Sequence, residues 1–515
     1  MGKSPLSPRP GATRTRTYLK GLGSGYVATL ATILVGLWLT PFTLRFLDRE
    51  EYAVFTLASD LLMWLGMLDL GVTAGLNVQA AQLSGRPDPE RLNRLASTAF
   101  FTQNGIVLGV IIVGAGIAVG FPHFFQVREE LRETSSNLMA LLVAGSAIGF
   151  STKTFSALLV AHQQIHIDNL LRLGMIGLRT ILTVLLLNAG WGLYSLGVAT
   201  LAASVTTSAL AVLRTRSALP GLRIKWSYAS WVELRGIGAL GIWFSLGGLA
   251  GLLIVSMDRV LVGKLFTVES VTTLSLTGRV YALASSVLEQ ITNTARPMIG
   301  QMLGQGRMTD VARLYQTLFK VCGGVAVLLA TSLWVGNGAF VTVWVGENHY
   351  GGAALNAALA ANLLTNTWVL PNRAVLASAM LVRAQTICRL LEAVVNLGAS
   401  IMLGHQFGMI GIVIGTTVGG VMTSVWYLPL LTARFLGRRV CLFWLRDASA
   451  VMAVAICLVP VAWGARSFAL HYSGPLPMLF ASGITGIAGL GLILAFCLDD
   501  SMKSKLRNLK RKRIS

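Results

Sequence analysis

The chain has 515 residues, of which 54% are hydrophobic and only 12% are charged, and this composition excludes an ordinary soluble protein with about 25% charged residues. Its net charge of +21 comes from 42 Lys and Arg against 21 Asp and Glu. These charges lie mainly between apolar runs and no separate basic domain is present, so they indicate the positive-inside bias of a membrane protein and argue against nucleic-acid binding.

Long apolar runs follow one another along the whole chain, and each can cross a bilayer as a helix. Open strands cannot satisfy their backbone groups in lipid, so every span is predicted to be helical. The sequence therefore predicts an all-α polytopic membrane protein with about 14 transmembrane helices. The predicted spans are 23–46, 52–80, 93–121, 136–160, 169–189, 192–213, 235–263, 270–298, 311–336, 353–380, 386–404, 408–433, 447–465 and 475–498.

An internal repeat relates the two halves of the chain at a constant offset of 219 residues. It keeps one register without a gap over more than fifty positions. The aligned pairs include Arg45 and Lys264, Glu50 and Glu269, Leu57 and Leu276, Gln82 and Gln301, Gly85 and Gly304, and Phe100 and Phe319. We therefore predict two pseudo-symmetric six-helix lobes, followed by two extra C-terminal helices that have no counterpart in the repeat.

The predicted organisation has two lobes between basic tails. It comprises a cytoplasmic tail (1–22), the N-terminal lobe (23–213), a cytoplasmic linker (214–234), the C-terminal lobe (235–433), two extra helices (434–498) and a second cytoplasmic tail (499–515). Lys and Arg are several-fold more frequent in the connections on the N-terminal side of the membrane. Both termini are therefore predicted to be cytoplasmic.

Charged side chains within the spans are the candidate functional residues, because each costs roughly 2.5–3.5 kcal/mol at the bilayer centre unless it faces protein or water. The repeat aligns Asp60 with Arg279, so an acid in one lobe corresponds to a base in the other. Asp60 and Asp69 are half a turn out of phase in a continuous helix, so we expect only Asp60 to line a cavity. The selected substrate-binding or cavity residues are Asp60, Asp69, Asp258, Arg259, Arg279 and Glu289.

Two interpretations of these charges stay open. Asp60 with Arg279, and Asp258 with Arg259, would form ion pairs that hold helices together. Alternatively, the arginines would grip an anionic head group while a carboxylate carries a coupling proton or cation. Four further charges are expected to reach the cytoplasmic interface instead: Lys153, Arg296, Arg373 and Glu392.

No pattern in the sequence points to a metal, a cofactor or a catalytic group. The five cysteines are scattered, and the six histidines do not converge with carboxylates. No phosphate-binding loop indicates an ATPase. The outer turns are too short for the catalytic loop of an oligosaccharide polymerase or ligase, so a membrane enzyme is the least favoured class.

Two pairs of segments resemble those of polysaccharide-biosynthesis flippases. LRFLDREEYAVFTLA (44–58) with MLDLGVTAGL (67–76) is similar to the first hairpin of Wzx-type members of the multidrug/oligosaccharidyl-lipid/polysaccharide exporter superfamily. SMDRVLVGKLFTVESV (256–271) with ARPMIGQML (295–303) is similar to their second-lobe segment. Asp48 stands where that family usually has Gly.

The resemblance implies alternating access that moves a polyprenyl-diphosphate-linked oligosaccharide across the bacterial cytoplasmic (inner) membrane. It also implies contact with membrane lipids, and we expect a monomer. The sequence leaves open whether H⁺, Na⁺ or no ion drives transport. The alternative is a multidrug or small-molecule antiporter of the same superfamily, against which the basic residues Arg259 and Arg279 count.

Overall fold

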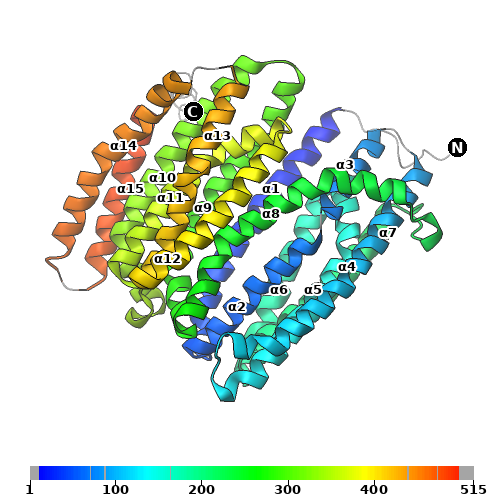
Figure 1. Cartoon of the computed structure of the whole chain (residues 1–515), viewed down its shortest axis with the longest axis horizontal. Helices are drawn as coiled ribbons and strands as arrows, with labels where there is room; N and C mark the ends of the chain where they lie inside the picture. Colours follow the sequence, from blue (N-terminus) through cyan, green and yellow to red (C-terminus); the bar gives the residue numbers. More distant parts are fainter. Residues whose placement is uncertain are drawn as a thin grey trace, which may run out of the picture. The chain divides into compact units, whose positions relative to one another are not determined.

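The computed structural model describes residues 11–69, 71–85, 88–162, 164–437, 440–472 and 474–497. Residues 1–10 and 498–515, which hold most of the two predicted basic tails, lie outside the described residues. The described part of the chain contains helices and no strands, which confirms the all-α prediction (Figure 1). The chain divides into two compact units, Met1–Leu252 (unit 1) and Leu253–Ser515 (unit 2).

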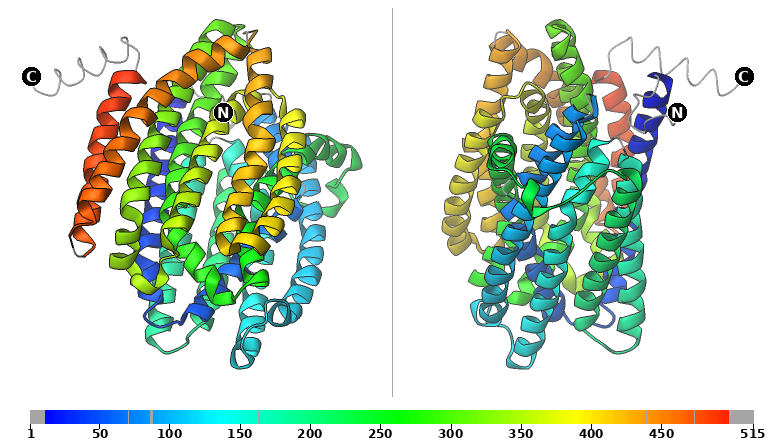
Figure 2. Two further views of the ribbon diagram at one scale, coloured as in Figure 1. Left: turned by 60° about the vertical axis from the view of Figure 1, so that its left-hand side comes forward. Right: turned by 90° about the vertical axis from the view of Figure 1, so that its right-hand side faces the viewer.

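Unit 1 is a bundle in which α5 packs between α4 and α7, and α6 packs against α1 and α7. The right-hand view in Figure 2 shows these blue-to-green helices of unit 1 running alongside one another. The elements are α1 (Gly11–Thr43), α2 (Arg49–Leu65), the 3-10 helix η1 (Gly66–Asp69), α3 (Val72–Gly85), α4 (Pro89–Phe124), α5 (Glu129–Ala161), α6 (Ile165–Asn188), α7 (Tyr194–Ala218), η2 (Trp226–Tyr228) and the first part of α8 (Trp231–Leu265).

Unit 2 is centred on α10, which packs against α9, α11, α14 and α15. Its apolar core joins Val327 of α10 to Val454 of α14 and Ile493 of α15, so the two C-terminal helices are part of the unit. The elements are the rest of α8, α9 (Val268–Gly304), α10 (Met308–Val345), η3 (Glu347–His349), α11 (Gly352–Ser378), α12 (Val382–Met422), α13 (Ser424–Phe435), α14 (Val440–Ala469) and α15 (Leu476–Phe496).

α12 contains two spans, because the chain reverses within it at Gly408 (φ 66°, ψ −150°). Three glycines after the turn each lie so close to a residue before it that a Cβ atom would not fit. The pairs are Gly411 with Leu403, Gly415 with Ser400 and Gly419 with Asn396. These small residues let the two halves of α12 form a tight helical hairpin.

The described helices account for all the predicted spans. Among the described residues, nine helical stretches are long and apolar enough to cross a membrane, and one of them, Val382–Phe435, contains the reversal at Gly408. The other spans correspond to α1, to α2 with α3, to α9 and to α11. The predicted boundaries between tails, lobes and linker stay predictions; the division between the two units falls within α8.

The repeat reappears in the bounds of the helices. α2 begins at Arg49 and α9 at Val268, which are 219 residues apart, and the same offset separates the first residues of α4 and α10. α3 and α9 also end 219 residues apart, at Gly85 and Gly304. One difference separates the two copies: α9 is continuous, whereas its counterpart is broken into α2, η1 and α3.

Candidate functional site

The break in the second span lies beside Asp69. α2 ends at Leu65, and Gly71, with φ +77°, stands just before α3. A Cβ atom on Gly71 would lie 2.2 Å from the carbonyl oxygen of Gly241 in α8, so only glycine fits this position. The half-turn phase difference between Asp60 and Asp69 applies to a continuous helix. The break removes that basis for assigning them different roles.

Asp69 is held by a polar network within unit 1. Its carboxylate accepts hydrogen bonds from Thr73 Oγ1 (2.9 Å) and from Gln103 Nε2 (3.2 Å). The Gln103 Oε1 atom accepts a hydrogen bond from Thr154 Oγ1 of α5. Lys153, which lies over the Phe150 ring at 3.6 Å, is within electrostatic range of Asp69. The network ties the broken span to α4 and α5.

Asp60 lies on α2, five residues before that helix ends, and it is buried, with only 4% of its surface exposed. α2 packs against α5 within unit 1. A carboxylate that is buried in a membrane span persists where it has polar partners or a function. Its alignment with Arg279, which belongs to unit 2, stays a prediction.

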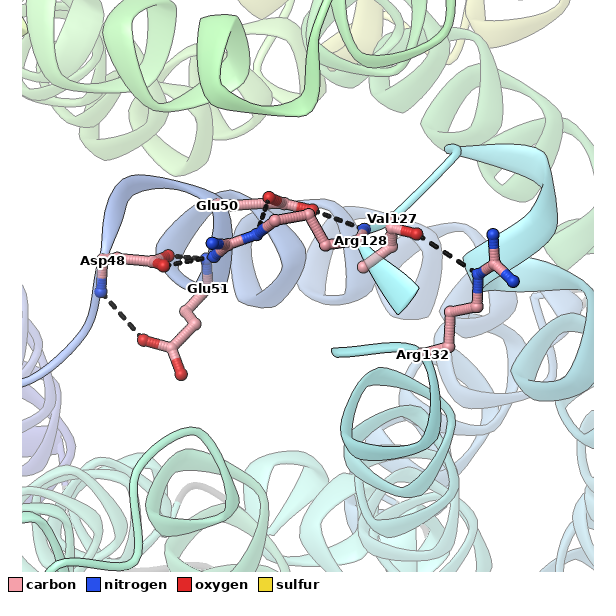
Figure 3. Close-up of polar contacts among 6 residues, drawn as sticks. All are labelled: Asp48, Glu50, Glu51, Val127, Arg128 and Arg132. Atoms are coloured by element: carbon pink, nitrogen blue, oxygen red, sulfur yellow. Dashed lines mark hydrogen bonds and ion pairs between the residues drawn. The ribbon is translucent and has the colours of Figure 1, made fainter. Parts of the chain in front are cut away.

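A cluster of charges, here called the Arg128 clasp and consisting of Asp48, Glu50 and Arg128, joins two turns of unit 1 (Figure 3). The Arg128 guanidinium pairs with Asp48 and, at 2.5 Å, with Glu50 Oε2, while its backbone N–H donates to Glu50 Oε1 at 2.8 Å. Asp48 also caps α2 in a reciprocal capping box with Glu51. Asp48, which stands where the flippases that this chain resembles usually have Gly, therefore has a structural role as the cap of α2.

The electrostatics of this turn follow from its contacts. Burial raises the pKa of the Glu51 carboxyl, although the hydrogen bond from the Asp48 backbone N–H opposes the shift. The hydrogen bond and the charge of Asp48 raise the pKa of Arg128 above its ordinary value. The clasp lies on the side of the membrane that the charge bias predicts to be outside.

Asp258 contacts Thr416, which begins a chain of four uncharged oxygen atoms in unit 2; we call these atoms and the Asp258 carboxylate the Asp258 oxygen cluster. Thr416 Oγ1 lies 2.7 Å from Asp258 Oδ1 and 3.1 Å from Asn396 Oδ1. Ser400 Oγ lies 2.9 Å from Asn396 Oδ1 and 2.9 Å from the carbonyl oxygen of Ile412. The cluster thus joins α8 to both halves of the α12 hairpin.

The Asp258 oxygen cluster has fewer protons than short oxygen–oxygen contacts. Four contacts link its five oxygen atoms, yet only the Thr416 and Ser400 hydroxyls carry protons there when Asp258 is ionised. A half-turn of the Asn396 amide would place its NH₂ group inward and satisfy both hydroxyls. With the amide oxygen inward, a proton or a hard monovalent cation completes the set, because such ions prefer carboxylate, amide, hydroxyl and carbonyl oxygens.

The remaining predicted residues lie on α8 and α9 of unit 2. Arg259 follows Asp258 in α8 and interacts electrostatically with it. Arg279 is partly buried on α9, and its Nε atom is buried without a hydrogen-bond partner in the described structure. Glu289 lies exposed on the same helix and interacts with Arg296 and Arg389. The structure therefore groups Glu289 with arginines that the sequence did not select.

Sequence reasoning was wrong about Arg373 and Glu392, which do not reach the interface. The two residues are 7% and 5% exposed and form an ion pair of 3.5 Å between α11 and α12. It also missed Thr416, Asn396 and Ser400. The only signal is that Asn396 and Ser400 are four residues apart, which puts these two on one helix face but identifies neither Thr416 nor the facing helix.

Comparisons with known proteins agree with this fold. The MatE family model matches residues 26–185. The uncharacterized membrane protein EpsK of Bacillus subtilis is 21% identical over 507 residues, covering 94% of this chain and 96% of that protein. The chain also resembles the inward-facing conformation of a multidrug resistance MATE family transporter of the MOP superfamily, with a TM-score of 0.67 and 16% identity over 80% of this chain and 95% of that one.

A MOP superfamily transporter from Pyrococcus furiosus, whose binding pocket is described as having reverse polarity, is 16% identical with a TM-score of 0.60 and covers 84% of this chain and 98% of its own. A point mutant of the Vibrio cholerae MATE transporter VcmN gives a TM-score of 0.61 at 16% identity over 83% and 98% of the two chains. The family match and the shared fold agree with a multi-pass membrane protein built like these transporters. The chain is therefore similar to the MatE family over residues 26–185, and it shares the fold of MATE transporters.

Proposed function

We propose that the protein flips a polyprenyl-diphosphate-linked oligosaccharide across the membrane by alternating access. The observation that carries the proposal is the partly buried guanidinium of Arg279, whose Nε has no hydrogen-bond partner among the described residues. A desolvated guanidinium without full pairing is costly, and its planar fork matches two phosphate oxygens. A substrate that carries a diphosphate would supply those oxygens.

The two C-terminal helices support a lipid-linked substrate. The alignment with the multidrug MATE transporter covers 95% of that chain but only 80% of this one, so about a fifth of this chain has no aligned counterpart there. α14 and α15 have no counterpart in the 219-residue repeat, and they pack tightly onto α10: a Cβ atom on Gly323 would lie 2.7 Å from Val451. Two helices added to one unit provide apolar surface that a long polyprenyl chain requires and a small drug does not.

The Asp258 oxygen cluster is the proposed site of the coupling ion. Asp258 supplies the only charge of the cluster, and Thr416, Asn396, Ser400 and the Ile412 carbonyl supply neutral oxygens. Binding of a cation or a proton would draw α8 and the α12 hairpin together. Coupling follows because helices that move during transport would bind the ion with different affinity in each conformation.

A multidrug antiporter is the second candidate, and the multidrug transporter among the structural neighbours favours it. Buried Asp60 and the networked Asp69 would suit a cationic drug. The arginines on α8 and α9 do not. A sensitivity panel of cationic drugs on a deletion strain separates the two: increased sensitivity with unchanged surface glycan supports the antiporter.

The direct experiment is to delete the gene and follow lipid-linked glycans. The proposal expects a diphosphate-linked oligosaccharide to accumulate on the cytoplasmic face and surface polysaccharide to disappear, both restored by the intact gene. Unchanged lipid-linked intermediates and unchanged polysaccharide would contradict it.

A further inference from the structure

Unit 2 contains a second group of intramembrane charges that the transport proposal does not use. Arg296 on α9, Arg373 on α11 and Arg389 on α12 interact electrostatically with one another, and Glu289 and Glu392 lie among them. We call these five residues the arginine cluster. α11 packs against both α9 and α12, and Ser378 Oγ donates to the Arg296 carbonyl at 3.2 Å, which fixes the neighbouring ends of α9 and α11.

Within the described residues, the arginine cluster contains a single ion pair. Arg373 lies 3.5 Å from Glu392 Oε2, and the same oxygen accepts a hydrogen bond from Ser424. Arg296 and Arg389 have no carboxylate within 4.0 Å among these residues. Three guanidinium groups and two carboxylates leave one net positive charge in a setting where like charges repel strongly.

The donors of the cluster are also incompletely used. The Nε atoms of Arg373 and Arg389 are buried and have no hydrogen-bond partner in the described structure. Arg373 is only 7% exposed, so water cannot easily replace the missing partner. Each buried donor that stays unpaired costs about 1–3 kcal/mol, and more when it is charged.

We propose that the arginine cluster binds a phosphate-type anion between α9, α11 and α12. An anion with several acceptor oxygens would supply the missing partners of both Nε atoms and offset the excess positive charge. Guanidinium groups bind such oxygens in pairs, and this favours phosphate over a single-point anion such as chloride. Exposed Arg296 and Glu289 form the open side of the site.

The position of the cluster suits a membrane-borne phosphate. Arg373 lies five residues before the end of α11 and Arg389 seven residues after the start of α12, about 8–10 Å from the helix ends. These ends are predicted to face the cytoplasm. Two sources share the chemistry: the head group of an inner-leaflet anionic phospholipid and the diphosphate of a lipid-linked substrate. The inference does not require the chain to be a flippase.

Binding is tested on the purified full-length protein in maltoside micelles after removal of phospholipid. Thermal unfolding is followed at fixed ionic strength while potassium pyrophosphate, or phosphatidylglycerol in mixed micelles, is titrated. The variants are Arg389→Gln and the double variant Arg373→Gln/Glu392→Gln, which removes a buried pair without leaving one charge alone. Arg434→Gln, an exposed arginine on α13, is the matched control.

The expected result is saturable stabilisation of the wild type and of Arg434→Gln, with affinity reduced roughly tenfold or more in both cluster variants. A response to pyrophosphate alone identifies a diphosphate as the source, a response to phosphatidylglycerol alone identifies a phospholipid, and a response to both identifies phosphate chemistry in general. No saturable response to either probe, or an equal response in Arg389→Gln and Arg434→Gln, overturns the inference.

Discussion

Thr416 places its hydroxyl oxygen 2.7 Å from the Asp258 carboxylate, which links the α12 hairpin to α8 inside unit 2. The contact is unusual because the same hydroxyl also lies 3.1 Å from the Asn396 amide oxygen, and one proton cannot serve both acceptors. The shortage of protons makes this cluster the part of unit 2 best suited to take up a cation or a proton.

The first prediction concerns this cluster. Asp258→Asn removes its only charge, so we expect loss of transport and loss of any stabilisation by Na⁺ over K⁺. Thr416→Val removes one oxygen and should lower the affinity for the cation roughly tenfold, as expected for the loss of one contact to a charged group. Thermal unfolding in Na⁺, K⁺ and at varied pH measures both, because a ligand that binds only the folded state raises its stability.

Thr417→Val, which changes the next residue outside the cluster, is the control for this experiment. Stabilisation that depends on pH but not on Na⁺ would assign the site to a proton. Stabilisation of the wild type and Asp258→Asn to the same extent by every cation would contradict the assignment.

The second prediction concerns the broken span. Gly71→Ala places a Cβ atom 2.2 Å from the Gly241 carbonyl oxygen at φ +77°, so we expect strong loss of folded protein. Gly190→Ala is the matched control, since φ is +81° but nothing lies within 4 Å of the added atom. Yield of monodisperse protein and the unfolding midpoint distinguish the variants. Equal effects would mean that the approach of α3 and α8 is not tight.

The third prediction concerns the Arg128 clasp. Arg128→Ala removes the ion-pair partner of the buried Glu50 carboxylate, which keeps only the hydrogen bond from the backbone N–H of residue 128, and we expect a loss of about 1–3 kcal/mol in the free energy of unfolding. The double variant Arg128→Ala/Glu50→Gln should recover part of that loss, because it removes the carboxylate charge that lost its ion-pair partner. The half-exposed pair with Asp48 contributes little by itself. A double variant less stable than Arg128→Ala would show that the Glu50 charge has another partner.

The sequence predicts the architecture well because its signals are local or periodic. Long apolar runs define the spans, and the offset of the 219-residue repeat agrees with the starts of α2 at Arg49 and α9 at Val268. The break at Gly66–Asp69 is not predictable in this way, because glycine is common in membrane helices and only the approach of Gly241 shows that Gly71 is required.

The candidate site is less predictable from sequence. Asp258 is selected from its depth alone, but its partner Thr416 lies 158 residues away on the face of another helix. Arg373 and Glu392 are expected to reach water because the ends of their spans are near. The structure instead turns both inward, and a single chain carries no signal for that orientation.

The fourth prediction separates pairing from substrate binding at the aligned charges. If Asp60 and Arg279 formed an ion pair, the exchange Asp60→Arg/Arg279→Asp would restore activity that each single substitution removes. We expect no restoration, because the proposed role of Arg279 is to bind an anion. Surface polysaccharide, normalised to folded protein in the membrane, is the measurement, and recovery in the exchanged variant would support the structural pair.

The most direct test of the central claim is the sidedness of the lipid-linked glycan in cells that carry Arg279→Ala as their only copy. The account predicts that polyprenyl-diphosphate-linked oligosaccharide accumulates on the cytoplasmic face while the variant remains folded at wild-type abundance, and that Arg279→Lys keeps partial export. Normal export of the glycan by folded Arg279→Ala protein would contradict the account.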